Sequence, residues 1–510
     1  MAYFPTIALG LPFFKGSLID AQASAFYDRV IADGGIVPTG LIGVSATFTA
    51  VKAIYGVSDI TAALSVFYEP HYLGYKLGTG TGATAGQAIE KLYSACGASG
   101  DCVQTTLSSQ PLLLEHSGVN YVYLSGISGN YFSTPNAAAN QITGDIEIIA
   151  KINVTNINTT QHIVAKRSLI TNIGYTLVIG SSRLNFQFSL NGTTNLLVQS
   201  TVNVPFTANQ DYWVKATRSA TNGNVEFYTS GDGVIYTQLG TTVASTSGSM
   251  FNSTQVLEIG SRGTGSSQLL QGKVYYASIT NTIGGAPTQI FNPNNYVAAT
   301  SQSQWTSSTG EVWTRNRDVL TTGLKSAIVD RTMMMTNGTS HAMSAASLNI
   351  NAAAITNYTA FSKFNNSVTG MISELGVDAD SVSGYFHAAN GAPSTDSTNI
   401  YGNVGANGSV WTQASTALKL GAMIGDTTLS NPETSYYINN AAATLSAGGN
   451  TANNTANMNG TALNLFARNN GASLWFNGSF RTMMIAPNSQ DAAERLAIYN
   501  YIKSLNNNAF

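Results

Sequence analysis

Two acidic residues in one short segment have a spacing that sugar-cleaving chemistry could use. Asp145 and Glu147 lie in the run Thr143-Gly144-Asp145-Ile146-Glu147, and alternate residues of a strand point to the same face. A retaining glycosidase uses two carboxyl groups about 5 Å apart, one as nucleophile and one as acid. The position two residues before Asp145 is a threonine, so a third carboxylate is missing. We expect a strand with one solvated face here rather than a catalytic site.

Nucleophiles and metal ligands show no grouping along the chain. No Cys-x-x-Cys or His-x-x-x-His pair occurs, and no Gly-x-Ser-x-Gly elbow stands between a strand and a helix. The sequence therefore predicts no catalytic residues, no metal site and no cofactor, although Asp378 and Asp380 are a pair that Ca²⁺ could use. We expect each of the five histidines at the surface or in an interface: His71, His116, His162, His341 and His387.

The two cysteines leave two chemical states open. Cys96 and Cys102 flank the five residues Gly-Ala-Ser-Gly-Asp. A small-loop disulfide fits this spacing, and so do two free thiols. Assembly in a reducing cytoplasm would favour the thiols.

Aromatic side chains among amides offer a different kind of site, a surface for sugar rings. The loop-rich stretch 381–413 carries Tyr385, Tyr401 and Trp411 among asparagine and serine residues. Sugar sites usually combine aromatic faces with a few well-placed polar groups. These three are therefore the candidate carbohydrate-binding residues. The alternative is that they pack inside the protein or in a subunit interface.

Low charge narrows the choice of partners. Only 9% of the 510 residues are charged, with 23 basic and 25 acidic side chains and a net charge of −2. Nucleic-acid binding depends on clustered Lys and Arg, so we expect no nucleic-acid partner. No apolar run has the roughly 18 residues of a membrane helix, so we expect no membrane partner. The apolar residues 1–14 are interrupted by Pro5 and Pro12, and we expect them to form an ordered arm. A surface so poor in charge suits a homo-oligomer.

Helical spacing marks the two ends of the chain. Residues 19–33 carry apolar side chains at helical intervals and are followed by Gly34-Gly35, which predicts a helix. Weaker patterns predict further helices at 59–69 and 85–95, so that the first hundred residues form a small helical module. Near the other end a stripe at i, i+3, i+4 and i+7 predicts an amphipathic helix that docks on the rest: Ile498, Tyr501, Ile502 and Leu505.

The rest of the chain has the alternation of strands and an internal repeat. Leu184, Phe186 and Phe188 alternate with polar residues, and turns such as Asn191-Gly192 separate the runs, which favours antiparallel sandwiches. Six residues recur after a constant offset of 206, which indicates two copies in tandem. Leu257, Arg262, Gly265, Ser267, Gly272 and Ile279 return as Leu463, Arg468, Gly471, Ser473, Gly478 and Ile485.

Several runs of the first copy together resemble the concanavalin A-like, laminin-G-type jelly-roll domains, above all those of tailed-bacteriophage virion proteins. They are GNYFSTPN (129–136), ITGDIEIIAKIN (142–153), VEFYTSGDGVIYTQLG (225–240), VLEIGSRGTG (256–265) and GKVYYASITN (272–281). Residues 92–114 resemble the connector that precedes such domains, and residues 291–314 the tail that follows them. The second copy ends in a similar final strand and closing helix. The likeness covers residues 92–510.

This resemblance implies a mainly β fold, with two tandem concanavalin A-like antiparallel β-sandwiches after a small, mainly helical N-terminal module. The expected boundaries are an N-terminal anchoring module at 1–90, a connector at 91–114, the first sandwich at 115–300, a linker at 301–314 and the second sandwich with its helix at 315–510. The sandwiches are expected to fold without the N-terminal module.

The resemblance also implies a function. It predicts a non-enzymatic virion structural protein, a head-fibre, tail-fibre or decoration subunit that is made in the host cytoplasm and displayed on the particle as a trimer. The N-terminal region would bind capsid or tail proteins, and the sandwiches would contact host-surface glycans. The alternatives are a carbohydrate-binding adhesin or receptor-binding protein and, third, a glycan hydrolase. Related sandwich hydrolases carry Glu-x-Asp-x-Glu, and Thr143 at the first position of this pattern removes the nucleophile.

Overall fold

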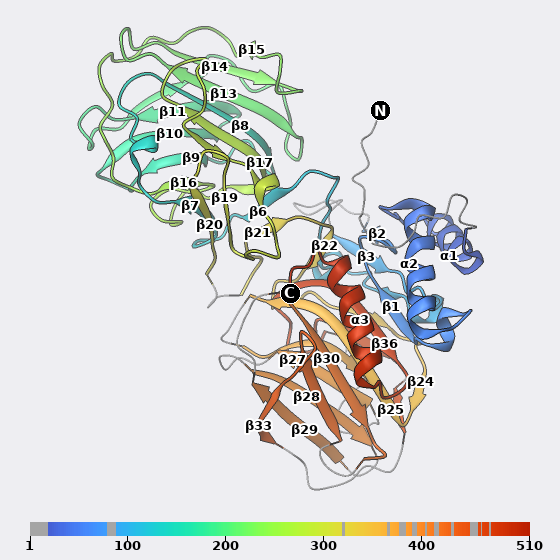
Figure 1. Cartoon of the computed structure of the whole chain (residues 1–510). Helices are drawn as coiled ribbons and strands as arrows, with labels where there is room; N and C mark the ends of the chain where they lie inside the picture. Colours follow the sequence, from blue (N-terminus) through green and yellow to red (C-terminus); the bar gives the residue numbers. More distant parts are fainter. Residues whose placement is uncertain are drawn as a thin grey trace.

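The computed structural model describes residues 19–78, 88–318, 322–364, 368–376, 384–389, 395–402, 405–412, 418–429, 433–448, 457–460, 462–468 and 471–510. Its strands build two antiparallel β-sandwiches, and a small N-terminal helical part lies beside the second one (Figure 1). The predicted fold class is therefore confirmed.

The first sandwich consists of two facing antiparallel sheets. One sheet has the order β15 (Thr237–Gln238), β14 (Val225–Ser230), β13 (Tyr212–Arg218), β8 (Ile146–Val154), β17 (Gln271–Thr280), β6 (Tyr121–Ser125) and β21 (Ala327–Val329), with β18 (Gln289–Phe291) also paired to β17. The other has the order β12 (Leu196–Gln199), β11 (Arg183–Phe188), β10 (Ile173–Gly180), β9 (Gln161–Arg167), β16 (Leu257–Ile259), β7 (Tyr131–Thr134), β20 (Val312–Asn316) and β19 (Gln304–Thr306). Apolar side chains of both sheets form one buried core between them.

The second sandwich has the same plan. One sheet has the order β32 (Ala441–Ala442), β31 (Thr434–Ile438), β30 (Lys419–Asp426), β25 (Ala354–Lys363), β36 (Gly478–Ala486), β22 (Met333–Met335) and β5 (Leu112–Leu114), with β1 (Val66–Tyr68) also paired to β36. The other has the order β2 (Tyr75–Leu77), β3 (Ile89–Leu92), β4 (Cys102–Val103), β23 (Met343–Ala345), β35 (Leu463–Leu465), β26 (Gly370–Leu375), β27 (Gly384–Ala389), β28 (Thr395–Gly402), β29 (Gly405–Thr412) and β33 (Thr444–Gly448). A separate pair joins β24 (Ile350–Ala352) to β34 (Met458–Gly460).

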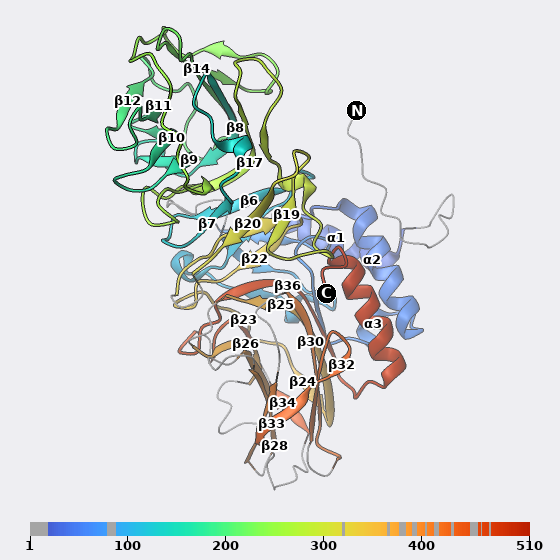
Figure 2. The same ribbon diagram turned by 60° about the vertical axis from the view of Figure 1, so that its left-hand side comes forward.

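Three helices form a layer on the outside of the second sandwich. They are α1 (Ala21–Ala32), α2 (Gly40–Tyr55) and α3 (Ala492–Leu505). Their apolar faces share one buried cluster with β25, β30 and β36. The predicted C-terminal stripe of four residues is buried in that cluster, and the predicted helix at 19–33 is confirmed as α1. Figure 2 shows the layer from the side.

The other two predicted helices are wrong. Residues 59–69 form a single 3₁₀ turn, Ile60–Ala62, followed by β1, and β3 occupies part of 85–95. The short apolar runs there have no period long enough to separate helix from strand. Further 3₁₀ turns lie at Ala98–Gly100, Leu107–Ser109, Ala138–Asn140 and Pro293–Asn295.

The sequence repeat corresponds to a structural repeat. β16 and β17 lie 206 residues before β35 and β36, and the bridge from Arg262 to Ser267 returns as the bridge from Arg468 to Ser473. A Cβ atom on Gly272 would lie 2.0 Å from a backbone oxygen, and one on Gly478 would lie 2.2 Å from another. Both glycines therefore permit the same close approach of the neighbouring strand.

The strands that complete the second sandwich come from before the first one. β1 pairs with β36 so that Tyr68 faces Met483, and β18 pairs with β17 so that Phe291 faces Ala277. Since Met483 lies 206 residues after Ala277, β1 fills in the second sandwich the place that β18 fills in the first. Likewise, β4, β3 and β2 extend the sheet beyond β23 as β20 and β19 extend it beyond β7. We call β1–β5 the upstream segment and β18–β21 the middle segment.

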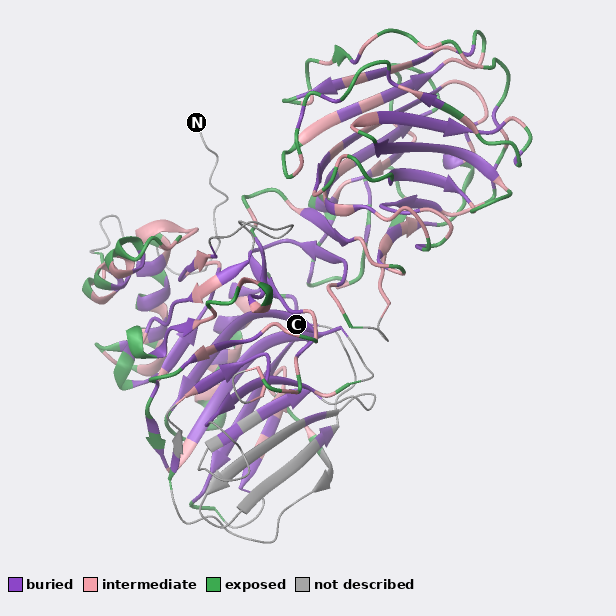
Figure 3. Ribbon diagram, turned by 180° about the vertical axis from the view of Figure 1, so that it is seen from behind, coloured by how far each residue is buried: buried purple, intermediate pink, exposed green. Residues whose placement is uncertain are grey.

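The two sandwiches also exchange one strand each at their junction. β5 directly precedes β6 of the first sandwich but pairs with β22 of the second, with Leu113 facing Met334. β21 directly precedes β22 but pairs with β6, with Ile328 facing Val122. The two strand pairs share a buried cluster that includes Leu114, Tyr121 and Val329. Figure 3 shows buried residues continuing through this junction.

This arrangement corrects the predicted boundaries. The 1–90 module and the 91–114 connector contain β1–β5, which belong to the sheets of the second sandwich, and the 301–314 linker contains β19 and most of β20. This pairing argues against the expectation that the second sandwich folds without residues 1–90. These strands are two to five residues long, too short for a periodic signal, and they pair over long sequence separations.

Candidate functional site

The aromatic platform predicted from the sequence is not formed by two of its three residues. Tyr385 on β27 and Trp411 on β29 are both buried in the core of the second sandwich. The Tyr385 hydroxyl accepts a hydrogen bond from Asn357 Nδ2 at 3.2 Å. Packing inside the sandwich, the alternative that the sequence left open, therefore describes these two. The side chain of Tyr401 lies outside the described residues.

A chain of buried polar groups lies near these aromatic rings. The Tyr436 hydroxyl donates to Asp396 Oδ2 at 2.8 Å and lies 3.0 Å from His387 Nε2, while Lys419 Nζ lies 3.0 Å from the same carboxylate. Burial lowers the pKa of His387 to about 4 and also lowers the pKa of Lys419. All four residues are buried, so this chain holds the two sheets of the sandwich together instead of meeting a ligand.

The two carboxylates of the candidate hydrolase motif have structural partners. Asp145 precedes β8, and its Oδ1 accepts a hydrogen bond from Ala220 N at 2.7 Å. Glu147 is buried within β8, and its Oε2 lies 3.9 Å from Lys215 Nζ. The predicted strand is present, and Glu147 points to the same outer face of the sheet as Lys215, where neighbouring side chains leave it only 7% exposed. Each carboxylate is used in the packing of the first sandwich.

The first sandwich carries an aromatic group on its outer face that the sequence analysis missed. On β13 the inward residues are Val214 and Ala216, so Trp213 and Lys215 point outward. The ring centres of Trp213 and Tyr276 lie 5.6 Å apart, and both side chains are half-buried. The alternation in Tyr-Trp-Val-Lys-Ala is the signal that could have identified this face.

Two tyrosines extend this group across the sheet. Lys215 Nζ lies 4.5 Å from the ring centre of Tyr228 and 4.6 Å from that of Tyr236. Burial raises the pKa of each tyrosine to about 12, so both hydroxyls are protonated at neutral pH. Rings, hydroxyls and an ammonium group thus share one partly exposed surface. We call Trp213, Lys215, Tyr228, Tyr236 and Tyr276 the outer aromatic face.

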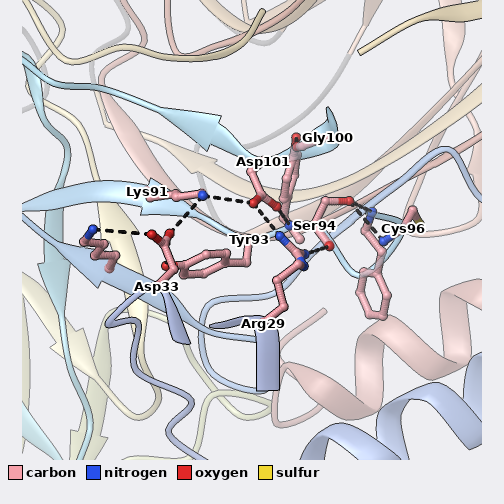
Figure 4. A network of polar contacts seen from close by, with 11 residues as sticks. Arg29, Asp33, Lys91, Tyr93, Ser94, Cys96, Gly100 and Asp101 are labelled. Carbon is pink, nitrogen blue, oxygen red and sulfur yellow. Dashed lines mark hydrogen bonds and ion pairs between the residues drawn. The ribbon is translucent and has the colours of Figure 1, made fainter. Parts of the chain in front are cut away.

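A polar network fixes the helical layer to the second sandwich (Figure 4). Arg29 of α1 donates to Asp101 Oδ2 at 2.5 Å and to the Ser94 carbonyl at 2.8 Å. Lys91 of β3 lies 3.2 Å from Asp101 and 2.9 Å from Asp33. The Lys91 and Tyr93 hydrogen bonds to Asp33 lower the pKa of that carboxyl. The network therefore joins α1, the turn after it and the strands of the upstream segment.

The helical layer also exposes apolar side chains. Ile42, near the start of α2, is 78% exposed, and three other isoleucines of this region are exposed to a lesser degree. They are Ile19, Ile31 and Ile36. Exposed apolar side chains mark a surface that binds another protein where they form one continuous patch.

Two of the histidines differ from expectation, and the cysteines are in one of the two states that the sequence left open. His162 and His387 are fully buried, so the prediction of a surface or interface place is wrong for both, while His71, His116 and His341 are half-buried. Burial lowers the pKa of His162 to about 3. Cys96 and Cys102 are free thiols, and burial raises the pKa of each to about 12, which keeps them protonated and unreactive.

Within the ranges that the structure describes, no three His, Cys, Asp or Glu side chains come together as metal ligands. Asp378 and Asp380 lie outside those ranges. In the same part of the chain, no helix has both the length and the apolar character needed to cross a bilayer.

Comparison with known proteins gives only distant structural likenesses. No family model and no curated protein matches the chain. Domains LG4–5 of the mouse laminin α1 chain are 10% identical with a TM-score of 0.26, over 73% of this chain and 90% of that one. A CBM40 module of the Ruminococcus gnavus IT-sialidase, bound to α2,3-sialyllactose, is 10% identical with a TM-score of 0.23, over 29% and 83%. A heptameric SAP-like pentraxin from Limulus polyphemus is 14% identical with a TM-score of 0.25, over 33% and 78%. Likenesses at this level carry no argument about function.

Proposed function

We propose that this protein is a non-enzymatic structural subunit of a tailed-bacteriophage particle, a fibre or decoration protein attached through its N-terminal region. The sequence resemblance to virion sandwich domains motivates the proposal. The observation that carries it is that the two ends of the molecule differ. The helical layer packs on the second sandwich, and the first sandwich stands apart from it (Figures 1 and 2).

The helical layer is the end that we assign to attachment. It exposes isoleucines, Ile42 above all, and the Arg29–Asp101–Lys91 network fixes α1 to the second sandwich. A rigid apolar surface loses little conformational entropy when a partner binds. The partner we propose is a capsid or tail protein, and the displayed form is a homo-oligomer, a trimer, on the particle surface.

Two matched isoleucines test this assignment. Ile42 on the helical layer and Ile170 on the first sandwich are each 78% exposed, so Ile42→Asp and Ile170→Asp should cost the fold equally little. We expect particles assembled with Ile42→Asp to lose the protein and those with Ile170→Asp to carry it at normal occupancy. Immunogold negative-stain images and quantitative mass spectrometry of purified particles measure this. Equal occupancy of both variants, or absence of the wild-type chain from particles, would contradict the proposal.

The outer aromatic face supports a second function, the binding of a host-surface glycan. Sugar rings stack on partly exposed Trp and Tyr faces, and hydroxyl and ammonium groups nearby select the sugar. The single observation in its favour is the Trp213–Tyr276 pair beside Lys215. On a glycan array, Trp213→Ala should abolish binding, whereas Trp475→Ala, which removes a half-buried tryptophan of the second sandwich, should not. An array on which the wild-type chain binds nothing would rule this function out.

A further inference from the structure

A cavity lies at the junction of the two sandwiches, and residues of both line it. Arg315 and Arg317 come from the end of the first sandwich, and Arg481 comes from β36 of the second. The space open to the centre of a water molecule is about 30 Å³, two to three times what one water needs. No lining residue is acidic. In a chain with only 9% charged residues, three guanidinium groups around one cavity need an explanation.

The three guanidinium groups are poorly neutralised by the described residues. Arg481 is 6% exposed, and only its Nη2 has a partner, Asp330 Oδ1 at 3.1 Å. Arg317 stacks 4.2 Å over the Phe364 ring, and its buried Nη1 has no partner in the part of the chain that the structure describes. The same described residues offer the Arg315 guanidinium no ion pair. Within the described part of the chain, the one ion pair of these three arginines is that of Arg481 with Asp330.

These charges cannot be removed by deprotonation. Burial lowers the pKa of Arg315 and, further, that of Arg317, and each also feels a neighbouring arginine. An arginine nevertheless stays protonated in proteins. A buried cation without a counter-charge destabilises the fold, so an anion that enters the cavity would be bound strongly. Guanidinium groups suit oxyanions because each can donate two parallel hydrogen bonds.

The remaining polar groups of the cavity fit the same ligand. The hydroxyls of Ser362 and Ser479 are hydrogen-bonded to each other at 2.8 Å on neighbouring strands, so one of the two still has a proton to donate to a ligand. Gln302 reaches from the first sandwich to the second, where its Nε2 donates to the Leu418 carbonyl at 3.0 Å. The cavity is therefore closed by contacts that exist only when the two sandwiches are docked.

We propose that this cavity binds one small tetrahedral oxyanion, sulfate or phosphate, through Arg315, Arg317 and Arg481, and that the anion couples the two sandwiches. The site is independent of the glycan face and of the attachment surface. Its size admits an inorganic anion and excludes a sugar ring. Bound there, the anion would neutralise cations from both sandwiches at once.

Calorimetric titration of the full-length chain tests the binding. We expect sodium sulfate or sodium phosphate to bind with a stoichiometry of one, at constant ionic strength maintained with sodium chloride. The thermal midpoint should rise on the order of 5 °C at saturation. A single site predicts that the rise in the midpoint saturates with oxyanion concentration. The general stabilising effect of sulfate and phosphate on proteins does not saturate. Binding of neither oxyanion, or equal binding of chloride, would overturn the proposal.

Matched arginine variants locate the site. Arg315→Gln should weaken oxyanion binding about tenfold or more and, without oxyanion, should leave the midpoint unchanged or raise it, because one of three neighbouring like charges is removed. Arg183→Gln makes the same charge change on β11 of the first sandwich and should keep the full response. An equal response in both variants would overturn the site. If Arg315→Gln does not fold, the wild-type titration still decides.

Discussion

The two sandwiches share one strand order but obtain their edge strands in opposite ways. The first is completed by the middle segment, which follows it directly in the chain. The second is completed by the upstream segment, which reaches it from beyond the whole first sandwich. A repeat in sequence is therefore not an independent repeat in structure. The second sandwich cannot form its full sheets until the upstream segment is in place.

Truncation should separate the two sandwiches most strongly. A chain that begins at Gln104 lacks β1–β4 and, with them, strand partners of β36 and β23. We expect the second sandwich to unfold while the first, which keeps all its strands, remains folded. Limited proteolysis with mass spectrometry measures this. A chain that begins at Ile19 keeps every described contact and serves as the control. Two protected sandwiches in the shorter chain would show that the upstream segment is dispensable.

A buried ion pair provides the next largest effect. Glu69, next to β1, pairs with Arg331, which lies between β21 and β22, and both side chains are buried. Glu69→Gln leaves a buried cation unpaired and should lower the free energy of unfolding by about 3–5 kcal/mol. Glu90→Gln removes the partly exposed partner of Lys76 at 3.8 Å and should cost at most about 1 kcal/mol. Denaturant unfolding compares them, and similar losses would contradict the role assigned to the buried pair.

Matched glycines test whether the two sandwiches are built alike. Gly272→Ala and Gly478→Ala each push a Cβ atom against a strand oxygen, and each should cost about 1–3 kcal/mol. Gly144→Ala places its Cβ in open space and is the neutral control. Thermal unfolding of the three variants gives the values. A large loss for only one of the first two would show that the repeat does not keep the same strand contact.

Acid should destabilise both sandwiches, and one fully buried histidine in each should account for part of the loss. The pKa is about 3 for His162 and about 4 for His387 when folded, and about 6.5 when unfolded. Between pH 6.5 and these values only the unfolded chain takes up the proton, so stability falls as the pH falls, by about 1.4 kcal/mol per pH unit for each histidine. Urea unfolding between pH 7 and pH 4.5 measures the slope. His162→Gln or His387→Gln should reduce it, and an unchanged slope would contradict the assignment.

The sequence predicts the parts of this fold that carry long periodic signals. The alternation in β11 and the stripe on α3 could be read correctly because several residues repeat at one interval. β1–β5 and β18–β21 could not be placed, because strands this short pair with partners that only the complete fold brings near. Residue type alone also misplaced the candidate sugar site. Tyr385, Trp411 and Trp213 are all aromatic residues on strands. Whether a side chain points into the sandwich or away from it decides which of them is buried.

Native-state hydrogen exchange tests the dependence of the second sandwich on the upstream segment most directly. The amides of β1 should exchange with the same opening free energy as those of β36, and those of β18 with the same value as those of β17, because strands of one cooperative sheet open together. Measurement by mass spectrometry on the full-length chain resolves these four strands. If β1–β4 open at a much lower free energy while β36 stays fully protected, the upstream segment is an appendage and the account is wrong.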